Sequence, residues 1–167
     1  MIVVLIGKDY KEQLIMTQKF FIRFLILFIT INAFGQNADF NKKNGYAAEG
    51  YDVVAYFDQQ VQKGKEDLVY VYHGAKFSFS TTSNLNKFKS APDKYVPQYG
   101  GWCAYAIGKS GKKVKIDPET YEIRDGKLYL FYNFRSTNTL EKWISEGPET
   151  LRDRADRNWT KIVDKGK

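Results

Sequence analysis

The chain of 167 residues contains one cysteine, Cys103, and one histidine, His73. A single cysteine excludes an intramolecular disulfide, so the hydrophobic core must hold the fold unaided. A tight zinc site usually needs three or four nitrogen or sulfur ligands, which these two residues cannot supply without carboxylates. The sequence also lacks a Walker loop and a nucleophile elbow, the usual signatures of nucleotide binding and serine hydrolysis. These absences favour a protein without catalytic activity.

The N-terminal region has no apolar run long enough for a permanent membrane anchor. A spanning helix needs roughly 20 apolar residues, whereas the apolar run here covers residues 24–31. Lys19 and Arg23 precede this run, and the small residues Ala33 and Gly35 follow it at the positions that a signal peptidase reads. This order of features is typical of a signal peptide, and an uncleaved anchor is the alternative.

We therefore predict a signal peptide at residues 16–35, cleaved before Gln36, and no stable membrane span after cleavage. Met16 is the expected start, so residues 1–15 are interpreted as an extension from a mis-assigned start codon. Export to the periplasm or to the extracellular space follows from the signal peptide. The mature chain is then predicted to consist of a flexible tail at 36–45 and one domain at 46–164.

The mature chain carries a moderate excess of positive charge. Removal of residues 1–35 takes four of the 26 basic and two of the 19 acidic side chains, which leaves a net charge of +5. The basic residues are scattered, apart from a lysine-rich segment at 109–115 that we interpret as a solvated loop. Together with export, this distribution argues against a nucleic-acid partner. The expected partner is a small ligand or another envelope protein.

The first half of the predicted domain is rich in strand signals. An apolar strand at 68–72 is followed by the tight turn His73-Gly74, and then by Phe77 and Phe79 in alternation with polar residues. These features predict a hairpin. The segment 50–57 is apolar and rich in β-formers, which favours a further strand.

Helices are expected after these strands. Thr82-Ser83 can cap a short helix that carries Leu85 and Phe88 and ends before Pro92. Gly147-Pro148 separates two C-terminal helices. Their predicted apolar faces are Leu140, Trp143 and Ile144 in the first helix and Leu151, Ala155, Trp159 and Ile162 in the second.

A second hairpin precedes the C-terminal helices. It joins residues 121–124 to residues 127–132 through Asp125-Gly126, which supplies the positive φ that a type I′ turn needs. The hairpins and helices together predict an α+β domain. We expect a small antiparallel sheet built from hairpins, with short helices and the two C-terminal helices packed on it.

Cys103 lies in the segment PQYGGWCA at residues 97–104, where two adjacent glycines allow a close approach of the backbone. A thiolate in this segment could act as a nucleophile, a redox group or a soft metal ligand. The alternative is a buried thiol that packs as a small hydrophobe, as free cysteines often do. Tyr99 lies four residues before Cys103 and is a candidate neighbour in a ligand pocket.

Carboxylates and aromatic residues complete the candidate set. Asp52 adjoins an apolar segment, so we expect a partly buried carboxylate that serves either as a ligand or as the acceptor of a turn. His73 at a hairpin tip and Asp117 before a proline are interpreted as turn residues in the simplest case. The candidate ligand-binding residues are Tyr99, Cys103, Asp52 and Tyr56, and the candidate ligands of a transition metal ion are Cys103, His73 and Asp52. No catalytic residue is assigned.

Several segments, in this order and spacing, resemble the YHS domain family in its exported single-domain branch. The matching segments are GYDVVAYF at 50–57, YHGAKFSF at 72–79, NLNKF at 84–88, APDKYVPQYGGWCA at 91–104, DGKLYL at 125–130 and NW at 158–159. The resemblance covers roughly residues 46–160.

The resemblance raises the question of whether this chain binds a metal ion. YHS domains occur beside heavy-metal transporters and in some oxygenase subunits, where a Phe-Cys-Ser-x-x-Cys motif suggests metal binding. The corresponding run here is FSTTSN at 79–84, in which Ser80 and Asn84 replace both cysteines. Hydroxyl and amide oxygens do not replace thiolates as ligands of copper or zinc. A metal site in this chain would therefore have to be centred on Cys103.

The expected function is that of an exported, non-enzymatic module that binds a metal ion or a small ligand near Cys103. Two alternatives stay open. One is a thiol-redox or redox-sensing protein that uses Cys103, and the other is a structural or partner-binding domain of the cell envelope. The three hypotheses differ in whether solvent or a ligand reaches the Cys103 sulfur.

Overall fold

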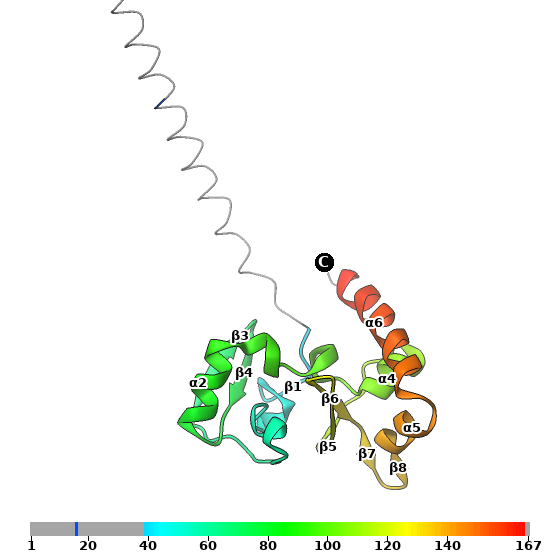
Figure 1. Cartoon of the computed structure of the whole chain (residues 1–167), viewed down its shortest axis with the longest axis horizontal. Helices are drawn as coiled ribbons and strands as arrows, with labels where there is room; N and C mark the ends of the chain where they lie inside the picture. Colours follow the sequence, from blue (N-terminus) through cyan, green and yellow to red (C-terminus); the bar gives the residue numbers. More distant parts are fainter. Residues whose placement is uncertain (1–15, 17–38, 166–167) are drawn as a thin grey trace, which may run out of the picture. The chain divides into compact units, whose positions relative to one another are not determined.

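The structure, a computed structural model, describes Met16 and residues 39–165 (Figure 1). The chain divides into two units, Met1–Gln36 and Asn37–Lys167, and the second contains the described residues 39–165. Apart from Met16, the predicted N-terminal extension and signal peptide lie outside the described residues. Within the described residues, no helix combines the length and the apolar character that crossing a membrane requires.

Four strands form the first sheet, in the order β1–β2–β4–β3. The predicted hairpin of β3 and β4 is confirmed, and the two strands pair antiparallel. The β2–β4 pair is parallel, so this sheet departs from the purely antiparallel one expected. The reason is the long connection after β2, which returns the chain to the same end of the sheet before β4 begins. The strands are β1 (Lys42–Lys43), β2 (Tyr46–Ala47), β3 (Val69–Tyr72) and β4 (Ala75–Ser78).

The described part of the predicted tail at 36–45 belongs to the folded domain. Strand β1 pairs with β2, and Phe40 is buried. The Asn41 N–H donates a hydrogen bond to the Gly100 carbonyl oxygen at 2.9 Å. The polar composition of this segment did not indicate its order, because backbone groups and one aromatic side chain hold it in place.

The segment 50–57, predicted as a strand, is not one. It runs through the 3-10 helices η2 (Ala48–Gly50) and η3 (Ala55–Asp58). Between them, the Asp52 carboxylate accepts hydrogen bonds from backbone N–H groups two and three residues ahead. Such a side-chain acceptor gives the backbone an alternative to strand pairing, and this explains why the β-rich composition did not produce a strand.

Helix α2 (Thr82–Ser90) covers the hairpin of β3 and β4, and α3 (Pro92–Tyr95) follows it (Figure 1). The helix is capped by Thr81, whose Oγ1 accepts from the Asn84 N–H at 3.1 Å, and not by the predicted Thr82-Ser83 pair. Phe88 of α2 stacks on Phe77 of β4, with 4.8 Å between the ring centroids. These contacts form the first part of the core.

The second predicted hairpin is confirmed as β5 (Asp117–Arg124) and β6 (Lys127–Phe131). Asp125 and Gly126 at its turn have φ values of 50° and 69°, as a type I′ turn requires. A shorter pair, β7 (Asn133–Phe134) and β8 (Thr137–Asn138), follows.

The remaining helices pack around β6 and form the second part of the core. Trp143, Leu151 and Ala155 are fully buried there, as their spacing predicts. Ile144, predicted on the same face as Trp143, is 57% exposed, because α5 presents only a narrow face to its neighbours. The expected α+β fold class is confirmed. The elements are η4 (Gln98–Gly101), α4 (Ala104–Ser110), α5 (Thr139–Ser145) and α6 (Pro148–Asp164).

Candidate functional site

Cys103 is completely buried in the core. Its Sγ atom lies 3.3 Å from Thr139 Oγ1 and accepts a hydrogen bond from the Tyr132 backbone N–H at 3.4 Å. The Cys103 N–H donates to the Val114 carbonyl oxygen at 3.0 Å. The thiol thus joins the start of α4 to the end of β6 and the start of α5. In this position it acts as a small core side chain with weak polar contacts.

Alkylation of the folded protein tests this placement. We expect Cys103 to react with N-ethylmaleimide at least about tenfold more slowly than an exposed thiol, because reaction requires local opening of the core. The control is the variant Cys103→Ser/Ser110→Cys, which moves the single thiol to an exposed position on α4. Equal rates for the wild-type protein and this control would contradict a buried Cys103.

Asp52 is the most extensively hydrogen-bonded of the candidate residues. It is completely buried, and its carboxylate accepts five hydrogen bonds. Oδ1 accepts from the N–H groups of Val54 and Ala55 at 2.9 and 3.3 Å. Oδ2 accepts from the Ser80 N–H and hydroxyl at 2.8 and 2.7 Å, and from Asn84 Nδ2 at 2.8 Å. This carboxylate therefore ties the 52–55 turn to the start of α2.

Ser80 and Asn84 occupy the positions of the two motif cysteines in the family resemblance. Both side chains donate hydrogen bonds to Asp52, and neither offers the thiolate that a soft metal ion prefers. In the part of the chain that the structure describes, no group of three or more His, Cys, Asp or Glu side chains could hold a metal ion. The residues present do not fit the metal site that the resemblance implies.

His73 lies at the turn between β3 and β4, with a φ of 45° and an exposed side chain. Its ring meets the edge of Tyr72, with 4.2 Å between the centroids. Cys103 and Asp52, by contrast, are buried. Over the described residues the structure does not assemble these three side chains into one metal-binding set.

Tyr56 is buried, and its hydroxyl donates to the Pro118 carbonyl oxygen at 2.7 Å. Burial raises the pKa of this phenol well above its usual value, so the hydroxyl stays protonated and keeps its hydrogen bond. The bond joins η3 to the start of β5. Tyr56 therefore supports the backbone there and does not line an open pocket.

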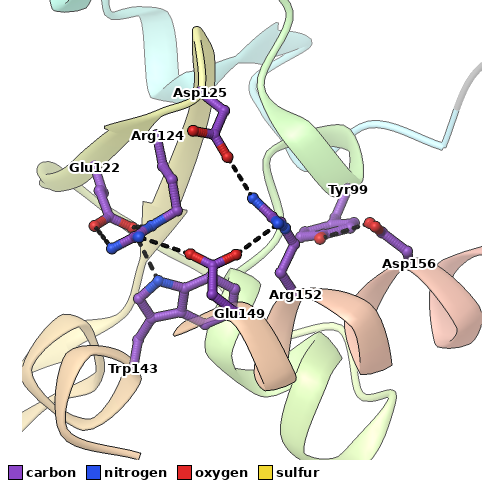
Figure 2. Close-up of polar contacts among 8 residues, drawn as sticks. All are labelled: Tyr99, Glu122, Arg124, Asp125, Trp143, Glu149, Arg152 and Asp156. Carbon is purple, nitrogen blue, oxygen red and sulfur yellow. Dashed lines mark hydrogen bonds and ion pairs between the residues drawn. The ribbon is translucent and has the colours of Figure 1, made fainter. Parts of the chain in front are cut away.

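Tyr99 is also buried, and it forms a polar contact with Asp156 (Figure 2). Its hydroxyl donates to Asp156 Oδ1 on α6 at 2.8 Å. Burial, followed by this hydrogen bond, raises the pKa of the Tyr99 phenol. The contact fastens η4 to α6.

Alkaline denaturation tests the environment of Tyr99. The folded state holds the phenolic proton at pH values where the unfolded chain, with a tyrosine pKa of about 10, has released it. The stabilisation from this burial is complete below about pH 10 and is lost as the pH rises further. We expect the free energy of unfolding to fall less steeply above pH 10 in Tyr99→Phe than in the wild-type protein. Identical slopes in urea titrations at several alkaline pH values would disagree with this expectation.

Figure 2 also shows ion pairs that join the β5–β6 hairpin to α6. Arg124 pairs with Glu122 at 2.6 Å and with Glu149 at 2.9 Å. Arg152 pairs with Glu149 at 2.5 Å and with Asp125 at 2.6 Å. Because most of these groups are partly solvated, each pair contributes at most about 1 kcal/mol. The network of two arginines and three carboxylates orients the hairpin against α6.

A cleft of about 370 Å³ opens elsewhere on the domain. Three segments meet there: the β1–η2 region, the connection before β3, and the start of β5. Two of the buried candidates support its walls, because Asp52 follows Tyr51 and Tyr56 holds the Pro118 carbonyl. The residues that line the cleft are Lys43, Asn44, Tyr46, Glu49, Tyr51, Lys63, Asp117 and Pro118.

No sequence pattern indicated this cleft. Lys43 and Asn44 fell in the predicted tail, and Asp117 was interpreted as a turn residue. Lys63 lies in a connection without any motif. No local signal could have joined these segments, because their proximity arises from the isolated bridge of Tyr51 to Lys63 and from the Tyr56–Pro118 contact.

Comparison with known proteins supports the family. The family model of the YHS domain matches residues 57–99, a segment that spans β3, β4, α2 and α3. It includes Ser80 and Asn84 and ends before Cys103. No curated protein and no solved structure matches the chain. The chain thus contains a YHS domain segment at residues 57–99.

Proposed function

We propose that this protein is an exported, non-catalytic binding module that takes a small polar ligand in the cleft lined by Tyr51. The cleft volume of about 370 Å³ is the observation that carries the proposal. Pockets for small molecules are usually between about 300 and 1,000 Å³. The walls carry amines, carboxylates and phenol rings from three segments, which suits a polar ligand.

The burial of Cys103 directs the proposal away from the thiol. A redox or sensor cysteine is expected to be accessible and activated by its surroundings. Cys103 is instead fully buried and contacts Thr139 and the Tyr132 N–H. A ligand site at the sulfur would require the core to open. The partner-binding alternative lacks a comparable feature, since nothing in the described residues indicates which partner would cover their surface.

Titration followed by NMR tests the cleft. Citrate, glucose, spermidine and L-alanine, at up to millimolar concentrations, represent anionic, neutral, cationic and zwitterionic ligands. We expect at least one of them to shift the backbone resonances of residues 43–51, Lys63 and Asp117 in a saturable way. Absence of saturable shifts at these residues with all four probes, and with the three aromatic probes described below, would overturn the proposal.

A parallel titration tests the metal alternative directly. Cu(I), Zn(II) and Ni(II) are added to the wild-type protein and to Cys103→Ser. We expect the two proteins to show no difference in micromolar binding, because Cys103 is buried without a set of neighbouring ligands. Binding that disappears in Cys103→Ser would restore the metal hypothesis.

Export has its own test. The predicted signal peptide at 16–35 supports secretion, and N-terminal sequencing of the protein recovered from the cell envelope or medium is expected to begin at Gln36. Retention of the full chain in the cytosol would contradict export without affecting the cleft.

A further inference from the structure

The charges in the cleft are only partly compensated within the protein. Lys43 pairs with Glu49 at 2.5 Å, so these two charges neutralise each other. Asp117 accepts hydrogen bonds from the Glu119 N–H and the Thr120 hydroxyl, both at 3.0 Å. Both of these donors are neutral, so neither supplies a counter-charge to the Asp117 carboxylate.

Lys63 is the positive counterpart. Its Nζ atom lies over the Tyr51 ring, 5.8 Å from the centroid. Among the ion pairs that the structure describes for residues 39–165, none involves Lys63 or Asp117. Among the described residues, the cleft thus contains one cation and one anion that form no ion-pair contact.

Tyr51 connects the two charges. The Lys63 ammonium lies over the face of the Tyr51 ring. The Tyr51 hydroxyl donates a hydrogen bond to Glu119 at 3.4 Å. Partial burial, then the negative charges of Glu119 and Asp117, raise the pKa of Tyr51. The hydroxyl end of the ring is therefore at negative potential, while the ring face carries an ammonium group. A cation and an anion are attracted to different parts of one aromatic surface.

We infer that the cleft binds a small zwitterion, with the ligand carboxylate toward Lys63 and the ligand ammonium toward Asp117. Such a ligand supplies the missing counter-charge to both groups, whereas a simple anion or cation supplies only one and meets repulsion from the other. The Tyr46 and Tyr51 rings line the same cleft and offer aromatic surface for an apolar side chain. A free α-amino acid has this combination of groups. This inference rests on the proposed function.

Three matched probes test the inference. L-phenylalanine carries both charges, hydrocinnamate carries only the carboxylate and phenethylamine carries only the ammonium group. We expect L-phenylalanine to bind at least tenfold more tightly than either of the other two, measured by NMR shifts at the cleft. Equal or weaker binding of L-phenylalanine would overturn the inference.

Two variants test which charged group of the ligand lies near Lys63 and which lies near Asp117. Lys63→Met is expected to lower the affinity for L-phenylalanine at least tenfold and to leave the affinity for phenethylamine no weaker. Asp117→Asn keeps one acceptor oxygen for the Glu119 N–H and removes the charge. It is expected to weaken the binding of L-phenylalanine by a similar factor and to leave the affinity for hydrocinnamate no weaker. Lys65→Met is the matched control, because Lys65 is exposed, close in sequence and not part of the cleft. The same affinity for L-phenylalanine in Lys63→Met and Lys65→Met would count against the assignment.

Failure of the inference can be separated from failure of the proposed function. If hydrocinnamate or phenethylamine saturates the cleft as well as L-phenylalanine does, the cleft is a binding site and only its charge preference is wrong. If none of the seven probes shifts the cleft residues, both the function and the inference are wrong.

Discussion

Replacement of Asp52 by alanine is expected to lower the free energy of unfolding by about 4 kcal/mol. The carboxylate accepts five hydrogen bonds in a site without solvent access. Its removal leaves buried donors on the 52–55 turn and on Ser80 and Asn84 without an acceptor. A buried unsatisfied donor costs about 1–3 kcal/mol, and local relaxation recovers part of the sum. Urea denaturation at neutral pH measures the effect.

The matched control is Asp58→Ala. Asp58 lies at the end of η3, six residues from Asp52, and its side chain is 59% exposed with one long contact to Lys87 at 3.7 Å. Its loss is expected to change the free energy of unfolding by no more than about 0.5 kcal/mol. Equal effects of Asp52→Ala and Asp58→Ala would show that the buried network does not hold the turn against α2.

Single and double substitutions of the partners refine the result. Ser80→Ala and Asn84→Ala each remove one side-chain donor and are expected to cost about 1–2 kcal/mol. Because both donors share the same Asp52 oxygen, the double variant is expected to deviate from additivity. Strict additivity would indicate that the two donors do not share this acceptor.

Gly108→Ala is expected to destabilise the protein by about 2 kcal/mol, although alanine is the better helix former by about 1 kcal/mol. Gly108 lies inside α4, where an added Cβ would be 2.5 Å from the Leu151 carbonyl oxygen of α6. It would also lie 3.5 Å from the Ala155 Cβ. Since a backbone carbonyl cannot rotate away as a side chain can, the two helices have to separate.

The sign of the change in the free energy of unfolding shows whether helix propensity or the close contact with α6 dominates in Gly108→Ala. A gain in the free energy of unfolding would mean that helix propensity outweighs the close contact with α6. Ser110→Ala, in the exposed last turn of the same helix, is the control and is expected to change stability by no more than about 0.5 kcal/mol. Thermal and urea unfolding of the three proteins compare these outcomes.

The hairpins and the last helix could be predicted because their signals are local. Asp125-Gly126 provides the two positive φ values of the β5–β6 turn wherever the chain goes next. In α6, the spacing of Leu151 and Ala155 specifies the buried face once a partner is present. Prediction failed at 50–57, where one hydrogen-bonding side chain, Asp52, outweighed a β-rich composition.

The candidate site, unlike the hairpins and the last helix, could not be predicted from local signals. The sequence indicated Cys103, Asp52, Tyr56 and Tyr99 as residues of interest, and all four are buried side chains that fasten elements to one another. The cleft residue Lys63 carried no signal at all. Side-chain type identifies which residues can do chemistry, but access decides whether they do, and access depends on the packing of distant segments.

Turn chemistry and periodicity act over a few neighbouring residues, so the sequence alone predicted an α+β chain with two hairpins and two C-terminal helices. It also indicated the YHS segment that the family model matches at residues 57–99. Only the tertiary structure decided that Cys103 is sealed in the core and that Ser80 and Asn84 turn toward Asp52. It also decided that Lys63 and Asp117 line one cleft. These outcomes depend on residues that are far apart in the sequence, such as Ser80 and Asp52, which are 28 positions apart, and Asp117 and Lys63, which are 54 positions apart and line the same cleft. No local pattern encodes such arrangements.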